Sequence, residues 1–134
     1  MATFEFNDGK EKEIKLKSPQ AKVFASLEIK TKSKSLKVAG FTVINTDGNI
    51  IIEDVQFDDA EIGIGNNIVD KIIKVVNDVT KFKVEEKELK EDDFVAECRL
   101  VFSDKNGTLG TLKISDADNP ESNSIFSFLI KFTK

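Results

Sequence analysis

The stretch DDAEIGIGNNIVDKIIKVVNDVTKF, residues 58–82, decides whether a helix accompanies the β-strands that the rest of the chain predicts. Its apolar residues recur at about 100° per residue and share one half of a helical circle, while its polar residues take the other half. Asn66 or Asn67 suits a helix N-cap, and Lys81 lies where a helix C-terminus attracts positive charge. The pattern predicts one amphipathic helix at about residues 66–82, packed on a sheet.

The apolar face of this predicted helix should belong to the core. It is formed by Ile68, Ile72, Val75, Val76 and Val79. All five are β-branched and therefore mediocre helix formers, so packing must stabilise the helix. We therefore expect Ile72→Asp to bury an unpartnered charge and unfold the domain, and Lys74→Asp to be nearly neutral.

Two glycines, Gly63 and Gly65, come just before this segment and resemble part of a phosphate-binding loop. The third glycine of a dinucleotide-binding G-x-G-x-x-G loop is Ile68 here, and no parallel strand follows the predicted helix. Asp58 and Asp59 would also repel a phosphate. The glycines are therefore interpreted as a hinge that gives the backbone freedom where a strand becomes a helix.

Alternating apolar and polar residues elsewhere predict strands. The candidate segments are residues 3–6, 13–17, 22–31, 35–45, 49–57, 94–103, 108–115 and 124–132. Asp47-Gly48 and Asn106-Gly107 are typical of two-residue hairpin turns, which makes the sheet antiparallel. The sequence predicts a single domain, residues 1–134, of mainly β (α+β) class. We expect an antiparallel β-sandwich or barrel-like sheet of about eight strands, with one helix packed on it.

The composition excludes much of the chemistry that enzymes use. The chain has no His, Trp or Tyr, a single Cys and eleven Phe. There is consequently no imidazole base, no Ser-His or Cys-His pair and no cysteine zinc site. We predict a protein that is not an enzyme and that has no catalytic or cofactor-binding residues. A single Cys suits a reducing compartment, and the polar N-terminus has no signal-peptide core, so we expect a cytoplasmic location, with leaderless export as the alternative.

One loop carries candidate metal ligands. The segment SDADNPES, residues 115–122, has oxygen donors at Asp116, Asp118, Asn119 and Glu121, which could hold Ca²⁺. The complete twelve-residue calcium loop is absent, and the same residues beside Pro120 are typical of turns. Asp58, Asp59 and Glu61 would complete such a site if the two loops met at one end of the sandwich. No other cofactor is expected.

The charges of the chain are unevenly distributed. Residues 1–44 hold nine Lys against five acidic residues, a balance of +4, and residues 45–134 hold eleven basic residues against nineteen acidic ones, a balance of −8. The distribution is typical of a mixed, solvated surface. Alternatively, opposite charges gathered on two faces would favour head-to-tail assembly. Arg99 is the single arginine, whereas nucleic-acid readers use the guanidinium fork, so no nucleic-acid partner is expected. No apolar run approaches the roughly 18 residues of a membrane span.

These observations favour a non-enzymatic β-rich interaction or structural module that acts through protein–protein contacts and self-associates. The alternative is a small carrier that binds an apolar ligand, such as a lipid, in a Phe-lined cavity. A weaker alternative is a Ca²⁺-binding β-sandwich that uses the loop carboxylates.

Overall fold

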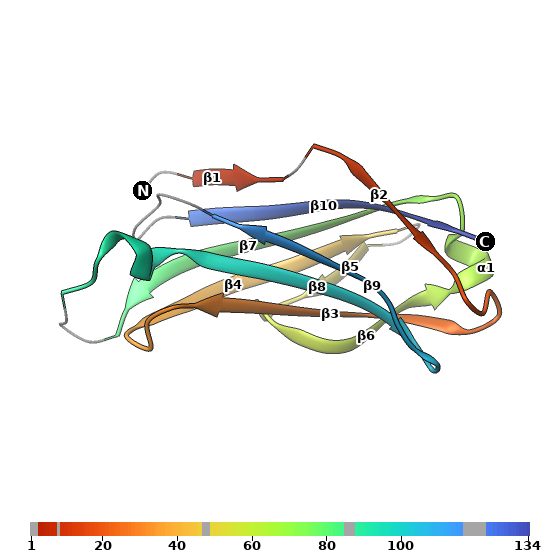
Figure 1. The fold of residues 1–134 in the computed structure, drawn as a ribbon, viewed down its shortest axis with the longest axis horizontal. Helices are drawn as coiled ribbons and strands as arrows, with labels where there is room; N and C mark the ends of the chain where they lie inside the picture. Colours follow the sequence, from red (N-terminus) through yellow and green to blue (C-terminus); the bar gives the residue numbers. More distant parts are fainter. Residues whose placement is uncertain (1–2, 8, 47–48, 85–87, 117–122) are drawn as a thin grey trace.

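The computed structural model describes residues 3–7, 9–46, 49–84, 88–116 and 123–134, which form two β-sheets packed face to face (Figure 1). The first sheet has six strands: β1 (Thr3–Phe6), β2 (Glu11–Lys15), β4 (Leu36–Asn45), β5 (Asn49–Ile52), β7 (Ile72–Lys83) and β10 (Asn123–Thr133). The second has four: β3 (Lys22–Thr31), β6 (Phe57–Ile64), β8 (Ala96–Asp104) and β9 (Gly107–Ser115). Two single turns of helix, α1 (Gly65–Ile68) and η1 (Glu91–Phe94), complete the described elements.

The strands are ordered β1-β10-β7-β4-β5 in the six-stranded sheet and β6-β3-β8-β9 in the four-stranded sheet. All described strand pairs are antiparallel except β1–β10 and β2–β10, which are parallel; β10 pairs with β7 in antiparallel orientation. The prediction of a mainly β, antiparallel-rich sandwich is therefore confirmed. The barrel-like alternative is wrong because the two sheets stay separate, and the described strands number ten rather than eight.

The predicted helix at residues 66–82 is wrong. Only α1 is helical there, and the chain then forms β7, which lies in the middle of the six-stranded sheet between β10 and β4. Side chains alternate along β7, so Ile73 and Val75 are buried whereas Ile72 is 51% exposed. The β-branched residues that weaken a helix fit a strand with neighbours on both sides, and tertiary pairing decides between the two patterns.

The hinge interpretation is confirmed for Gly63, with one turn of helix instead of a long one, whereas Gly65 is needed for a close contact. Gly63 has a φ of +139°, which favours glycine, and it stands where β6 ends. A Cβ on Gly65 would lie 2.8 Å from the carbonyl oxygen of Pro19, so the close approach of these two segments requires glycine.

The predicted hairpin at Asn106-Gly107 is confirmed, with the turn one residue earlier. Lys105 and Asn106 form the turn between β8 and β9, and the Asn106 amide donates a 2.7 Å hydrogen bond to Asp104 Oδ1. Gly107 follows with a φ of +123°. Asp47 and Gly48 lie outside the described residues, but β4 and β5 pair in antiparallel register on either side of them.

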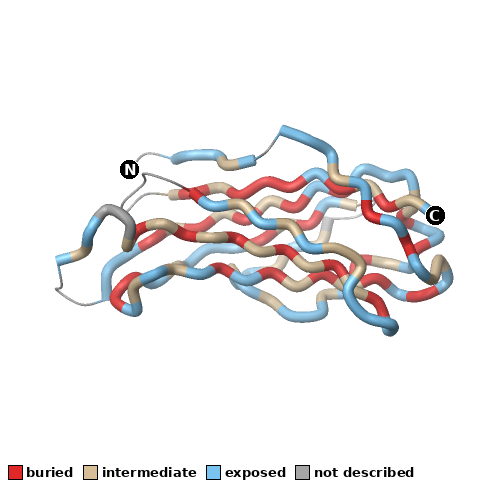
Figure 2. Tube along the Cα trace, in the orientation of Figure 1, coloured by how far each residue is buried: buried red, intermediate tan, exposed pale blue. Residues whose placement is uncertain are grey.

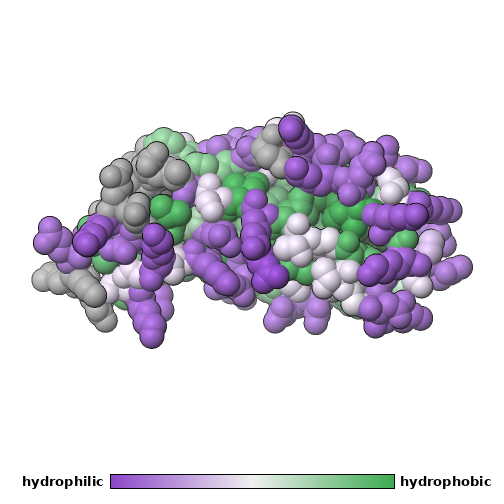
Figure 3. Space-filling view, viewed as in Figure 1, coloured by the Kyte–Doolittle hydropathy of each residue, from purple (hydrophilic) through white to green (hydrophobic). Residues whose placement is uncertain are grey.

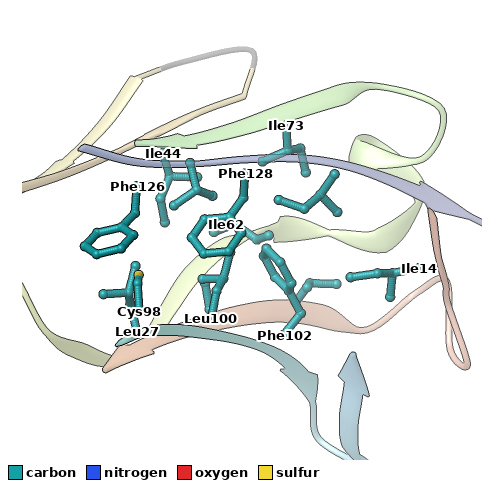
Figure 4. Close-up of a cluster of buried hydrophobic side chains, with 14 of the residues drawn as sticks. Ile14, Leu27, Ile44, Ile62, Ile73, Cys98, Leu100, Phe102, Phe126 and Phe128 are labelled. Carbon is teal, nitrogen blue, oxygen red and sulfur yellow. The ribbon is translucent and has the colours of Figure 1, made fainter. Parts of the chain in front are cut away.

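The core lies between the two sheets, where inward-facing side chains from nearly every strand meet (Figures 2 and 4). Buried and exposed residues alternate along the strands, as expected for sheets with one face on a core. The rings of Phe102 and Phe132 pack edge to face with their centroids 5.2 Å apart. The rings of Phe6 and Phe126 lie 6.0 Å apart. Most of the phenylalanines therefore fill the interior by packing on each other and on aliphatic neighbours.

Candidate functional site

The outer face of the six-stranded sheet carries an apolar cluster instead of the polar surface that a solvated face usually has. Six side chains from four neighbouring strands form this cluster, the outer patch: Phe41, Val43, Ile51, Val76, Ile125 and Leu129. Val76 of β7 is directly opposite Val43 of β4, which is opposite Ile51 of β5. Side chains that are opposite each other in register share one face of the sheet, so these three form a continuous row.

The remaining members flank that row. Phe41 and Ile125 are both in register with Asp78, which comes two residues after Val76 on β7. Leu129 is in register with Lys74, which comes two residues before Val76. Ile51 is 66% exposed, Phe41 45% and Leu129 37%. A contiguous apolar patch rimmed by polar groups is typical of a protein-binding surface.

Two charged side chains within the outer patch are arranged symmetrically about Val76. Lys74 and Asp78 stand two residues before and two residues after Val76 on β7, and both point to the same outer face. Asp78 Oδ1 accepts a 3.3 Å hydrogen bond from Asn123 Nδ2, which holds the carboxylate beside the patch. The two halves of the patch therefore carry charges of opposite sign.

A second apolar feature is a groove of about 460 Å³ along the edge of the sandwich between β2 and β9. Its apolar lining includes Ile14, Leu112, Ile114 and Phe128, and lysines stand at its rim. β1 pairs with β10 up to Phe126, and β2 resumes the pairing at Leu129, so neither strand covers the edge at Phe128. β2 then crosses the edge obliquely (Figure 1), and apolar surface shows in a band between hydrophilic side chains on this side (Figure 3).

The described phenylalanines do not line this groove as a group. Phe102, Phe126 and Phe132 are fully buried between the sheets, and Phe128 is the one described Phe that reaches the groove. These three rings fill the core by packing and do not surround a ligand cavity. An apolar ligand would instead have to use the groove between β2 and β9.

Asp116 is the one predicted metal ligand that the structure describes, because Asp118, Asn119 and Glu121 lie outside the described residues. Both of its carboxylate oxygens already accept hydrogen bonds. Lys81 Nζ donates to Oδ2 at 2.9 Å, Ser124 Oγ donates to Oδ2 at 2.6 Å, and the Ala96 amide donates to Oδ1 at 2.7 Å. A cation at Asp116 would have to displace the Lys81 ammonium group.

The other acidic residues proposed for that site lie on β6. Asp58, Asp59 and Glu61 are exposed there, and Glu61 forms a surface ion pair with Lys22 at 3.7 Å. Among the described residues, no three acidic or cysteine side chains gather as a metal-ligand group.

The ion pair between Lys81 and Asp116 was missed by the sequence analysis, which placed Lys81 on the solvated face of a helix. The side chains of both residues are 0% exposed, and Lys81 Nζ also donates to the Phe94 carbonyl oxygen at 2.8 Å. Lys81 comes from the six-stranded sheet and Asp116 follows the last residue of β9, so the pair joins the two sheets. A lysine at an inward position of a β-branched strand was the available signal.

Comparison with protein-family models, with curated proteins and with solved structures gives no match. Of the helices in the described part of the chain, none has the length and apolar character of a membrane span.

Proposed function

We propose that the protein is a non-enzymatic, β-rich interaction module that self-associates through the outer patch. The observation that carries this proposal is the apolar row formed by Ile51, Val43 and Val76 on a sheet face. Lys74 lies on one side of this row and Asp78 on the other. An apolar centre with a charged rim is the usual organisation of a protein interface. A lone, buried cysteine suits such a module in the cytoplasm.

The patch is complementary to a second copy of itself. A two-fold axis that passes over Val76, in the plane of the face and perpendicular to the strands, places Val76 on Val76 of the second copy. It also places Lys74 opposite Asp78 of the second copy, and Asp78 opposite Lys74. Leu129 then faces Ile125, because these residues are in register with Lys74 and Asp78. The contact is isologous, which is the commonest form of self-association.

Face-to-face packing of sheets tolerates the remaining charges. Glu5 and Glu11 lie at the β1–β2 edge and would approach each other across the same axis. Packed sheets cross at about 30°, which separates groups far from the crossing point at Val76 more than groups close to it. Lys74 and Asp78 are two residues from Val76 on the same strand, whereas the glutamates lie two strands away, so the attraction of Lys74 and Asp78 is retained.

Light scattering over a range of protein concentrations tests this proposal. We expect the wild-type mass to rise with concentration, and we expect Phe41→Lys with Ile51→Lys to give a monomer. The proposed axis would bring the two added charges at position 51 face to face and would bury the two at position 41 in the interface opposite Asn45. Both side chains are largely exposed, so the variant should keep its fold. The matched control, Thr111→Lys with Ser115→Lys, adds the same charge to exposed positions of β9 and should still self-associate. A strictly monomeric wild type, or a control that dissociates equally, would contradict the proposal.

The groove between β2 and β9 supports a second candidate function, the carriage of an apolar ligand. Leu112 and Ile114 are half-buried and offer an apolar lining there, beside the part of β10 that pairs with neither β1 nor β2. A bound fatty acid should raise the melting temperature with its concentration, as linkage requires. Native mass spectrometry should then find an adduct in wild-type protein that Leu112→Glu lacks. An empty protein from cell extract, with no melting shift for any fatty acid or sterol, would exclude this function.

A further inference from the structure

We propose that Lys81 and Asp116 condense to an intramolecular amide that bonds the two sheets covalently, since the Lys81 amine and the Asp116 carboxyl group meet at 2.9 Å in the interior with no access to water. This modification goes beyond the proposed interface and does not depend on it. Lys81 lies near the end of β7, and Asp116 follows β9, so the new bond would close the chain around β8 and β9.

The surroundings of the two groups favour the reaction over a permanent ion pair. Two buried ions lose their hydration, and their mutual attraction often fails to offset that loss, whereas an amide is neutral. The two side chains are held in contact by the fold, which replaces a bimolecular encounter with an effective concentration of about 10⁵ M or more. Burial also removes the water that would hydrolyse the product.

The hydrogen bonds at Asp116 are arranged as amide formation requires. The Ala96 amide donates to Oδ1 at 2.7 Å, where it can stabilise the negative charge that develops on this oxygen during attack on the carboxyl carbon. Ser124 Oγ donates to Oδ2 at 2.6 Å and so marks Oδ2 as the oxygen that receives protons. The Phe94 carbonyl accepts from Nζ at 2.8 Å and orients the amine.

The step balances without any further reactant. One proton moves from the ammonium group of Lys81 to Oδ2, which leaves a neutral amine and a neutral acid. The nitrogen lone pair then adds to the carboxyl carbon, and the electron pair of the C=O bond moves to Oδ1. A second proton passes from nitrogen to Oδ2, the bond from carbon to Oδ2 breaks, and Oδ2 leaves as water. The C=O bond to Oδ1 forms again, and the nitrogen keeps one hydrogen in the amide.

Intact-mass spectrometry of the folded and then denatured full-length protein tests the proposal. We expect the wild type to be lighter than its sequence by one water molecule, and a protease digest to contain a branched peptide joined at Lys81 and Asp116. Lys81→Arg keeps the positive charge but cannot condense in this way, so it should have its full sequence mass. Ser124→Ala should lose water more slowly than the wild type. The exposed pair Lys22 and Glu61, 3.7 Å apart, should stay unlinked in the same digest.

Two results would overturn the proposal. A wild type that keeps its full sequence mass after prolonged incubation in the folded state would show that the two groups form an ion pair only. A loss of water that persists in Lys81→Arg would show cyclisation of an aspartate on its own backbone. Because the wild-type mass is decisive by itself, the test holds even if a variant fails to fold.

Discussion

Asn77 Nδ2 donates a 2.7 Å hydrogen bond to Thr42 Oγ1 on the inner face of the six-stranded sheet, where both side chains are fully buried. Asn77 Nδ2 also donates to the Val55 carbonyl oxygen at 3.1 Å. The side chain thereby fastens β7 to β4 and to the segment that connects β5 with β6. Its Oδ1 is buried with no hydrogen-bond partner in the described part of the chain, so the amide stabilises through its donors alone.

Replacing both members of this pair should cost less than the two single replacements suggest. Asn77→Leu leaves the Thr42 hydroxyl and the Val55 carbonyl without their donor, at a cost of about 1–3 kcal/mol. Thr42→Val removes one acceptor and should cost about 1 kcal/mol. In the double variant both ends of the Asn77–Thr42 hydrogen bond are gone, so neither side chain keeps a buried polar group that has lost this partner. The cost of the double variant should therefore be less than the sum of the two single costs. Urea unfolding of the four proteins measures the coupling, and strictly additive values would show that the hydrogen bond contributes nothing.

Asn77 and Lys81 also explain why the sequence predicted a helix here. Both residues lie on β7 and point into the core, where each has buried partners that are distant in the sequence. The inward-facing positions of β7 are therefore not all apolar in the sequence. When these two positions are counted as polar, the apolar residues of the segment no longer alternate with polar ones, and their spacing matches the period of a helix instead. Neither Thr42 nor Asp116 can be assigned to its partner before the strand order is known.

The strands with mainly apolar inner faces were predictable. β3 and β8 alternate as expected, and the glycine after Asn106 indicates a hairpin that the structure contains. The outer patch was not predictable, because it depends on the register between β4, β5, β7 and β10. The single residues that compose it are ordinary exposed positions until the pairing places them side by side.

The neighbouring residues Ile72 and Ile73 should respond in opposite ways to the same substitution. Ile73 is 0% exposed in the core, so Ile73→Asp buries a charge without a partner and should abolish cooperative thermal unfolding. Ile72 is 51% exposed on the outer face, so Ile72→Asp should change stability by only about 0.5 kcal/mol. This reverses the expectation from the helical pattern. Circular dichroism melts of the two variants decide, and an unfolded Ile72→Asp protein would support a helix.

Gly40 should be far less tolerant of alanine than Gly107, although both have positive φ. A Cβ on Gly40 would lie 1.9 Å from the carbonyl oxygen of Asp78 on the neighbouring strand, so β4 and β7 would have to separate. At Gly107 the Cβ would meet no atom within 4 Å, and only the backbone strain of about 1–3 kcal/mol remains. We expect Gly107→Ala to melt cooperatively at a lower temperature, and Gly40→Ala to fold poorly. Equal melting temperatures would contradict this assignment.

Reversing the charges beside Val76 should separate the two-fold arrangement from other ways of self-association. Lys74→Asp and Asp78→Lys each place like charges opposite each other at two places in the dimer and should weaken it, by roughly 30-fold if each of the two repulsions costs about 1 kcal/mol. The double variant restores opposite charges and should recover most of the affinity. Sedimentation equilibrium at low and high salt measures these constants. A double variant as weak as either single variant would exclude the proposed axis while leaving the outer patch as an interface.

Cys98 should make the stability of the fold fall at alkaline pH. Burial raises the pKa of its thiol above the ordinary value of 9.0, because the thiolate would lose its hydration in the core. In the unfolded chain the thiol releases its proton near the ordinary value. At higher pH the folded state therefore holds more protons than the unfolded state, and the free energy of unfolding decreases as pH rises.

The contribution of Cys98 is complete below about pH 9 and is lost progressively above it, at up to about 1.4 kcal/mol per pH unit. Cys98→Ala removes this dependence, although it also costs stability at every pH because it leaves a small cavity. The difference in unfolding free energy between wild type and Cys98→Ala should therefore shrink between pH 8 and pH 10, as measured by urea unfolding. The titration of lysines affects both proteins alike and cancels in that difference. A difference that stays constant over this range would mean that the thiol ionises equally well in the folded protein, which contradicts its burial between the sheets.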